Sequence, residues 1–381
     1  MRVIRSGARW LLLFSVTLLT AAAGARSAGC PFTVDRVTRI TASQGISQTG
    51  RGNERCIALD PKGTAHLVWE DKRDGNFEIY YATFDGTRSP ETRLTRSNAD
   101  SNFPCIAVDG DRVYILWQEK IKNIAQLLYV CLAGGKEVAR KQLTEAPTGA
   151  ECPVAAVGPD GTLHVAWHQG TGAMTTIHYG KVVNHVLESR TSICDRHPSA
   201  FRPDLACDGA GRILVVWYEG TDVKSRFWDG TVWQDELLVA QGNHKSWRLS
   251  AASLSDGKWA AAWFDQAPKS TDVWAAFFDG KTWSKQARVN AGRTGFYPSV
   301  ASYGPGCLII VWEDQDLPRS EYLLMMRCYD GSGWSAPAEI ARGRTMSRYA
   351  SLAPGDGLVH AVWFGTASGD NEIYHGLLRR P

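Results

Sequence analysis

Beyond its first 29 residues, the sequence has almost no excess of charge of either sign. Its formal net charge is +3, but four of the 42 basic residues lie in the first 29 residues, which hold no acid. That leaves 38 basic residues against 39 acidic ones for the rest of the chain. Such a balance gives no support for nucleic-acid binding or for electrostatic attachment to a membrane.

Several motifs of cofactor and catalytic chemistry are also missing. No cysteine or histidine pair has zinc spacing, no glycine-rich loop is suited to phosphate, and no Gly-x-Ser-x-Gly nucleophile elbow occurs. Turns such as 159–161 lack the run of oxygen ligands that a calcium loop needs. We therefore expect neither a metal nor a cofactor.

Methionine is scarce, whereas glycine and tryptophan are abundant. The 381 residues include 5 Met, 37 Gly and 15 Trp, with 44% hydrophobic and 21% charged residues. This composition excludes a disordered chain and a disulfide-dense miniprotein. Abundant glycine and tryptophan instead favour a β-rich, turn-rich protein with ample core material.

The N-terminus has the pattern of an export signal. Residues 1–9 carry three arginines, 10–19 are mostly apolar, and small residues follow at 21–25. The apolar run is shorter than the ~20 residues that a spanning helix needs. We predict a signal peptide over 1–28 and a secreted, periplasmic or cell-surface protein. Residues 27–30 also resemble a lipoprotein box, with Ser27 in place of the usual leucine, so membrane attachment through acylated Cys30 stays open.

A repeat of about 49 residues follows. Seven short apolar runs each end in a tryptophan, and the spacings between these tryptophans are 48, 50, 50, 46, 49 and 51. The tryptophans are Trp69, Trp117, Trp167, Trp217, Trp263, Trp312 and Trp363. Each unit reads as four short strands, A to D, of which strand B carries the tryptophan.

The B runs are apolar at consecutive positions, which a strand adopts when both faces of its sheet are covered. Blades stacked around an axis give this cover, so we predict an all-β, seven-bladed β-propeller over residues 29–381. The last unit stops after its third strand, and residues 34–40 read as a fourth strand without the other three. We expect this N-terminal strand to close the last blade. An open β-solenoid is the alternative.

The repeat resembles the sialidase-type (BNR, or Asp-box) propeller repeat of secreted bacterial proteins, on motifs at 57–71 and 75–80. Asp-Gly-x-x-Trp at 229–233, 279–283 and 330–334 is similar to a degraded Asp-box. The resemblance implies the propeller fold and, in sialidases, an arginine triad that binds a carboxylate. It also implies a tyrosine nucleophile activated by a glutamate, with an aspartate as acid/base. The chain departs from that family because sialidases have six blades and residues 201–203 lack the isoleucine of the Phe/Tyr-Arg-Ile-Pro motif. Seven-bladed polysaccharide lyases form another similar group.

Nine cysteines in an exported chain indicate an oxidising compartment. Cys307 begins the B strand of blade six and Cys328 ends its C strand, so we predict a Cys307–Cys328 disulfide. The pairing of the other cysteines is left open.

Loops D–A and B–C converge at one end of a propeller axis, where function collects. Aligning the starts of the A strands puts these residues at one position: Glu54, Phe103, Cys152, Arg202, Arg248, Tyr297 and Arg348. Three arginines there offer planar donor forks that fit carboxylates. We predict a binding site for an acidic sugar that contains Arg202, Arg248 and Arg348, with Tyr297 beside them. The alternative is that these arginines pair with acids of neighbouring loops and tie blades together.

Acids recur at the second position after the repeat tryptophans, and Asp71, Asp265 and Asp314 are candidate acids at the same rim. His168 directly follows Trp167 and is a candidate acid/base or ligand. His66, His164 and His360 are equivalent across blades, which favours a scaffold role.

The sequence therefore predicts an exported propeller that recognises a glycan, or a cell-surface polysaccharide, at one end of its axis. Two alternatives stay open. One is an enzyme, either a sialidase-like hydrolase or a uronate polysaccharide lyase. The other is a non-catalytic scaffold that binds a protein partner.

Overall fold

The computed structural model describes residues 29–43, 45–50, 55–194, 199–242, 246–268, 270–291, 294–316, 321–343, 347–366 and 370–380. The predicted signal peptide at 1–28 and Glu54 of the predicted ring lie outside these residues. No helix in the described residues is long and apolar enough to cross a bilayer.

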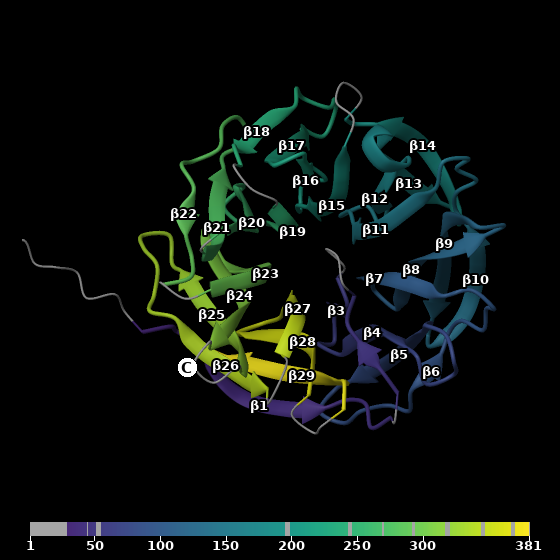
Figure 1. Ribbon diagram of the computed structural model, residues 1–381, viewed down its shortest axis with the longest axis horizontal. Coiled ribbons are helices and arrows are strands. Elements are labelled where there is room, and N and C mark those ends of the chain that lie inside the picture. The colour runs from purple at the N-terminus through teal and green to yellow at the C-terminus, as the bar shows by residue number, and fades with distance from the viewer. Residues whose placement is uncertain are drawn as a thin grey trace, which may run out of the picture.

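Seven antiparallel sheets surround one axis, as predicted (Figure 1). Blade one contains β2 (Ser47–Gln48), β3 (Ile57–Leu59), β4 (Ala65–Asp71), β5 (Glu78–Phe84) and β6 (Thr92–Arg93). Blade two contains β7 (Ser101–Asp109), β8 (Arg112–Ile121), β9 (Ile124–Ala133) and β10 (Lys136–Gln142). Blade three contains β11 (Ala150–Val157), β12 (Leu163–Gln169), the short helix η1 (Gly172–Met174), β13 (Thr176–Val183) and β14 (Val186–Ser192).

The remaining blades repeat this order. Blade four contains β15 (Ala200–Cys207), β16 (Ile213–Glu219), β17 (Asp222–Trp228) and β18 (Leu237–Ala240). Blade five contains β19 (Ser246–Ser253), β20 (Trp259–Ala267), β21 (Ser270–Phe278) and β22 (Ala287–Arg288). Blade six contains β23 (Thr294–Gly304), β24 (Cys307–Asp316), β25 (Glu321–Tyr329) and β26 (Ala338–Gly343). Blade seven contains β27 (Ser347–Pro354), β28 (Leu358–Gly365), β29 (Glu372–Arg379) and β1 (Thr33–Arg39).

The N-terminal strand closes the ring. β1 pairs antiparallel with β29, from Thr33 opposite Arg379 to Arg39 opposite Tyr374. This confirms the prediction that residues 34–40 complete the last blade. The closure covers the outer edge of β29, which would otherwise expose unpaired backbone groups.

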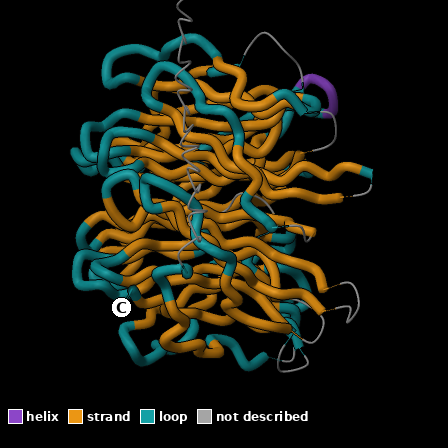
Figure 2. Tube along the Cα trace, turned by 90° about the vertical axis from the view of Figure 1, so that its left-hand side faces the viewer, coloured by secondary structure: helices purple, strands orange, loops and turns teal. Residues whose placement is uncertain are grey.

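The repeat tryptophans pack between blades. All seven are at most 2% exposed, and every residue of β4 is buried, which agrees with the unbroken apolar B runs. The A strands β7, β11, β15, β19, β23 and β27 line the axis, and the D strands form the outer wall (Figure 1). Figure 2 shows the loops gathered at the two ends of the blades, with η1 marking the end where the B–C loops emerge.

The repeated histidines belong to the scaffold, as predicted. The Nδ1 atoms of His66 and His164 lie 2.6 and 2.7 Å from the hydroxyls of Tyr81 and Tyr179 on the neighbouring C strand. His360 makes the equivalent contact with His375. Burial lowers the pKa of all three, so they stay neutral at physiological pH.

The predicted Cys307–Cys328 disulfide is corrected by the structure, in which both residues are free thiols. The register of β24 and β25 places Ile309, not Cys307, opposite Cys328. The sulfur of Cys328 instead lies 3.1 Å from that of Cys30. The two cysteines do lie near adjacent strand ends, as predicted, but the pairing of β24 with β25 is shifted by two residues from the register that a Cys307–Cys328 bridge requires.

Candidate functional site

Each A strand from blade two onward carries a backbone irregularity at the same point. In β7, for example, the register with β8 shifts between Asn102 and Cys105. The residue at the shift adopts a left-handed conformation with φ between 47° and 55° in all six strands. These residues are Phe103, Cys152, Arg202, Arg248, Tyr297 and Tyr349. Left-handed bulges of non-glycine residues are costly, so their repetition at one end of the axis indicates a functional constraint. We call the ring formed by these six residues and their neighbours at that end the rim.

The predicted alignment of the A strands was wrong by one residue in blade seven. The shift in β27 falls between Arg348 and Ser351, so Tyr349 is the bulge residue and Arg348 precedes it. Two arginines, Arg202 and Arg248, are therefore equivalent, and Arg348 reaches the rim from the neighbouring position. The error arose because blade seven lacks the proline that follows the bulge in four other blades.

A polar residue directly after a repeat tryptophan supports the bulge of the next blade. Glu70 accepts a hydrogen bond from the backbone N–H of Phe103, and the hydroxyl of Tyr218 accepts one from Arg248. Gln118 does the same for Cys152. Sequence reasoning missed this position, although a polar residue after the tryptophan in five of the seven B runs was a visible signal; Phe264 and Phe364 are the exceptions.

Replacing Glu70 with alanine is expected to destabilise the fold by about 1–3 kcal/mol, because it leaves the N–H of Phe103 and the amide of Gln48 without their acceptor. Glu70→Gln should cost less, since Gln118 performs the same role in blade two. Chemical denaturation of the two variants beside the parent measures the difference. Equal stability of all three would contradict this role for Glu70.

The acidic residues at the second position after the repeat tryptophans have side chains that point into the interior of their blades. Asp71 is fully buried and accepts hydrogen bonds from the Trp69 indole, the Ser47 hydroxyl and Arg73. Burial alone would raise its pKa, but the hydrogen bonds from Arg73 and Ser47 lower it overall. Asp314 is 2% exposed at the same place in β24, and Asp265 is half-buried in β20. Successive strand residues face opposite ways, so these acids point away from the side chains that support the rim.

Five side chains from blades five to seven meet at the rim: Arg248, Tyr297, Glu313, Arg348 and Tyr349. We call them the arginine–tyrosine cluster. Arg348 Nε lies 3.2 Å from Glu313 Oε1, and the Arg248 guanidinium lies 5.2 Å from the centre of the Tyr349 ring. The Tyr297 and Tyr349 rings meet edge to face at 4.6 Å.

Glu313 departs from its equivalents in the other blades. It occupies in β24 the place that Glu70 has in β4, and it is 1% exposed. Glu313 Oε1 and Arg348 Nε are buried and pair with each other at 3.2 Å. Glu313 Oε2 and Arg248 Nη1 are also buried, and neither has a hydrogen-bond partner among the described residues. Buried polar atoms normally have partners. Two such atoms in one cluster, beside an arginine–glutamate ion pair, therefore point to a site for a polar ligand.

Burial raises the pKa of Glu313 to about 8, and Arg348 and Arg248 offset only part of this effect. An unfolded glutamate ionises near pH ~4.3. Between these two values the native chain holds a proton that the unfolded chain has released. Stability therefore falls as the pH rises through this window and levels off above it.

Replacing Glu313 with glutamine should remove this fall. We expect the stability of the parent, relative to Glu313→Gln, to decline between pH 5 and pH 8 by about 1 kcal/mol or more. Urea denaturation at several pH values measures the difference, and Glu188→Gln on the exposed face of β14 controls for loss of a carboxyl group. Parallel pH profiles for the parent and Glu313→Gln would contradict the assignment.

A second group of rim residues adjoins the arginine–tyrosine cluster. His168 follows Trp167, packs edge-on against Phe201 at 5.6 Å, and is 7% exposed. Its pKa is lowered to about 3, first by burial and then by the charge of Arg202, so the imidazole is neutral. The charges of Arg202 and Arg248 both act on Tyr218. Tyr218 and its neighbours thus connect His168 and Arg202 to the cluster.

The axis below the rim is nearly closed. Arg55 reaches across to hydrogen-bond Asp204 and the carbonyl of Ala251, and Arg248 donates to the carbonyl of Ala350. The cavity between them measures about 20 Å³, room for about one water molecule. These contacts across the axis close the channel beneath the rim, and we call them the floor. A ligand at the rim would therefore approach from the opposite, loop-bearing end.

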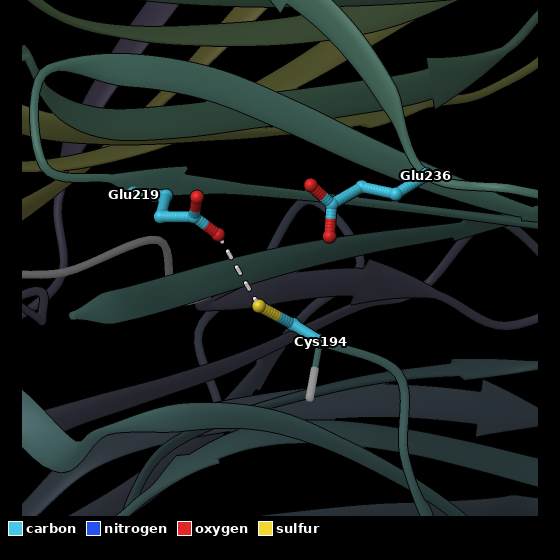
Figure 3. A group of neighbouring side chains, drawn as sticks. All are labelled: Cys194, Glu219 and Glu236. Atoms are coloured by element: carbon cyan, nitrogen blue, oxygen red, sulfur yellow. Dashed lines mark hydrogen bonds between the residues drawn. The ribbon is translucent and has the colours of Figure 1, made fainter. Parts of the chain in front are cut away.

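One group of side chains, from blade four and from the segment after β14 of blade three, has ligand atoms suited to a cation. Cys194, Glu219 and Glu236 place their ligand atoms within 4.8 Å of one another, and the Cys194 thiol donates to Glu219 (Figure 3). However, the ammonium of Lys224 lies 2.9 Å from Glu236 and 3.9 Å from Glu219. Burial and the nearby carboxylates raise the pKa of Cys194 to about 12, so the sulfur stays protonated. Lys224 already balances these carboxylates, and we assign no metal to them.

No protein-family model matches the sequence, and no curated protein is similar to it. Solved structures are similar in fold. An ulvan lyase bound to -[GlcA(1-4)Rha3S]- has a TM-score of 0.66 at 12% identity, covering 91% of this chain and 96% of that one. The phage phi92 endosialidase has a TM-score of 0.57 at 12% identity, covering 91% of this chain and 69% of that one.

An oligogalacturonate lyase from Vibrio parahaemolyticus has a TM-score of 0.53 at 12% identity, covering 92% of this chain and 98% of that one. At these identities the likeness concerns the fold. The chain has the propeller fold of known polysaccharide lyases and of an endosialidase. The Asp-box character of its repeat stays a prediction from sequence.

Proposed function

We propose that this chain binds an acidic glycan at the rim formed by the arginine–tyrosine cluster and Arg202. The observation that carries the proposal is that two buried atoms of the cluster, Glu313 Oε2 and Arg248 Nη1, have no hydrogen-bond partner among the described residues, next to the Arg348–Glu313 ion pair. A uronate or sialic acid carboxylate accepts paired hydrogen bonds from an arginine fork, and a protonated Glu313 can donate one. The rings of Tyr297 and Tyr349 offer faces on which a sugar can pack.

Two further observations support the proposal. Arg55 of the floor is balanced by Asp204, so the positive charge where the loops converge comes from Arg202, Arg248 and Arg348 of the rim. The similar propellers include proteins named for lyase action on ulvan and oligogalacturonate and for endosialidase activity, and the bound GlcA of the ulvan lyase is a uronic acid. We also propose that the chain works outside the cytoplasm, because residues 1–28 have the pattern of an export signal.

Calorimetric titration with oligomers of glucuronate, galacturonate and sialic acid tests the proposal. Neutral oligomers of glucose serve as the matched control. We expect saturable binding of at least one acidic oligomer, weakened by salt, and no binding of the neutral ones. Equal binding of neutral and acidic oligomers, or binding of none, would overturn it.

Turnover of the same ligand is the second candidate function. Glu313 is one of the groups whose charge acts on the Tyr297 phenol, and a phenol near a buried carboxyl group is a combination that proton transfer can use. Mass spectrometry of acidic glycans after incubation with the chain separates the possibilities. Free sialic acid would indicate a hydrolase, unsaturated uronate ends a lyase, and an unchanged pool a binding protein.

A further inference from the structure

We propose that Cys30 and Cys328 form a disulfide that ties the N-terminal segment to blade six. The two sulfur atoms lie 3.1 Å apart, although 298 residues separate them in the chain. A disulfide needs a sulfur–sulfur distance of ~2.05 Å, so a movement of about 1 Å brings them to bonding distance.

The packing around the pair holds it in place. Phe32 is 3% exposed and meets the Tyr303 ring edge to face at 5.0 Å, so the residues before β1 lie on blade six before the chain enters blade seven. Cys30 packs against the same hydrophobic cluster as Cys328. The bridge would thus link the strand that closes the ring to the blade beside it (Figure 1).

The neighbouring thiols differ in reactivity. The hydrogen bond from Cys328 lowers the pKa of Cys30 to about 7, whereas the same contact raises the pKa of Cys328. Cys30 therefore supplies a thiolate at neutral pH, which is the form that attacks a disulfide. Cys307, by contrast, has Gly304 opposite it in the adjoining strand.

The oxidant belongs to the class of small disulfides, such as oxidised glutathione. The Cys30 thiolate attacks one of its sulfur atoms, forming a mixed disulfide and releasing one small thiolate. The Cys328 thiol loses its proton and attacks the Cys30 sulfur, which releases the second small thiolate. Two protein thiols are oxidised and one small disulfide is reduced to two thiols. Bonded in this way, the Cys30 sulfur has no valence left for a lipid.

The test uses the full chain, produced without export, and compares it with Cys30→Ser, Cys328→Ser and the control Cys307→Ser. Each is equilibrated with a glutathione redox buffer, alkylated, digested and mapped by mass spectrometry. We expect the parent and Cys307→Ser to lose two alkylation sites, to yield a peptide pair joined through Cys30 and Cys328, and to gain several degrees in melting temperature. Cys30→Ser and Cys328→Ser should show neither change.

Full alkylation of Cys30 and Cys328 in the folded, oxidised parent would overturn the proposal. A peptide pair joined through Cys307 and Cys328 would overturn it as well. Circular dichroism before mapping verifies that each variant is folded, so that a failure to bridge reflects the thiols and not unfolding.

Discussion

Replacing Arg248 with methionine is expected to weaken binding of the acidic glycan by about two orders of magnitude. Arg248 Nη1 is buried and has no hydrogen-bond partner in the described part of the chain, and the same guanidinium lies against the Tyr349 ring. A hydrogen bond to a charged group contributes about 1.5–3 kcal/mol, so the loss of two from one fork corresponds to ~100-fold or more in affinity. Methionine keeps an unbranched apolar stem and therefore limits the damage to packing.

The comparison needs three matched variants. Arg348→Met should weaken binding by a smaller factor, because Arg348 Nε already lies 3.2 Å from Glu313 Oε1, which leaves fewer of its N–H groups for the ligand. Arg248→Lys keeps the charge without the planar fork and should fall between the parent and Arg248→Met. Arg342→Met removes an arginine that pairs with Glu321 and Glu339 on the outer wall, and should leave affinity unchanged.

Titration calorimetry gives the affinities, and thermal unfolding shows whether each variant keeps its fold. If Arg248→Met binds as tightly as the parent while folded, the rim does not bind the carboxylate. If Arg342→Met weakens binding equally, the effect is one of net charge and not of this site.

Removing residues 29–43 is expected to lower the melting temperature by about 10 °C or more and to cause self-association. The deletion removes the whole of β1 and the buried side chains of Phe32 and Ile40. It also leaves Glu372, which is fully buried, without Arg39 and Thr41. A buried charge that loses its partners costs about 3–5 kcal/mol, and the loss of β1 and its buried side chains adds to that cost. Each kcal/mol shifts the melting temperature by about 1–2 °C in a domain of this length.

Self-association follows from the exposed edge of β29, whose backbone groups would pair with other chains. Differential scanning calorimetry and light scattering, in reducing buffer, measure both effects. A chain that begins at residue 29 is the control and should match the parent. A synthetic peptide of residues 29–43 should restore part of the stability. A monomeric truncated chain with an unchanged melting temperature would contradict the closure.

The order of elements was readable from the sequence because it depends on local patterns. The regular spacing of Trp69 and its six equivalents, and apolar runs without alternation, require strands covered on both faces. The last unit has three strands and residues 34–40 form one strand without a unit, so counting strands was enough to predict that the two complete one blade. Each of these inferences needs only the covalent chain, the period of a strand and the rule that apolar surface is buried.

The site was predicted only in part, because it depends on register and on side-chain direction. Arg202 and Arg248 were correctly placed at equivalent positions, but the bulge falls at Tyr349 and not at Arg348. Glu313 was overlooked because acids recur at the second position after the repeat tryptophans, which directed attention to Asp314 and away from the position before it. A shift of one residue in a strand turns a side chain to the opposite face, and no periodicity of the sequence reveals it.

The sequence by itself thus determined the fold class, the number of blades and the closure by the N-terminal strand. Burial of repeated apolar runs dictates these features whatever the details of packing. Only the tertiary structure decided which polar groups meet. Arg248 and Glu313 belong to different blades, and Cys30 and Cys328 lie at opposite ends of the chain. Contacts between residues so far apart depend on how whole blades pack around the axis, which local pattern does not specify.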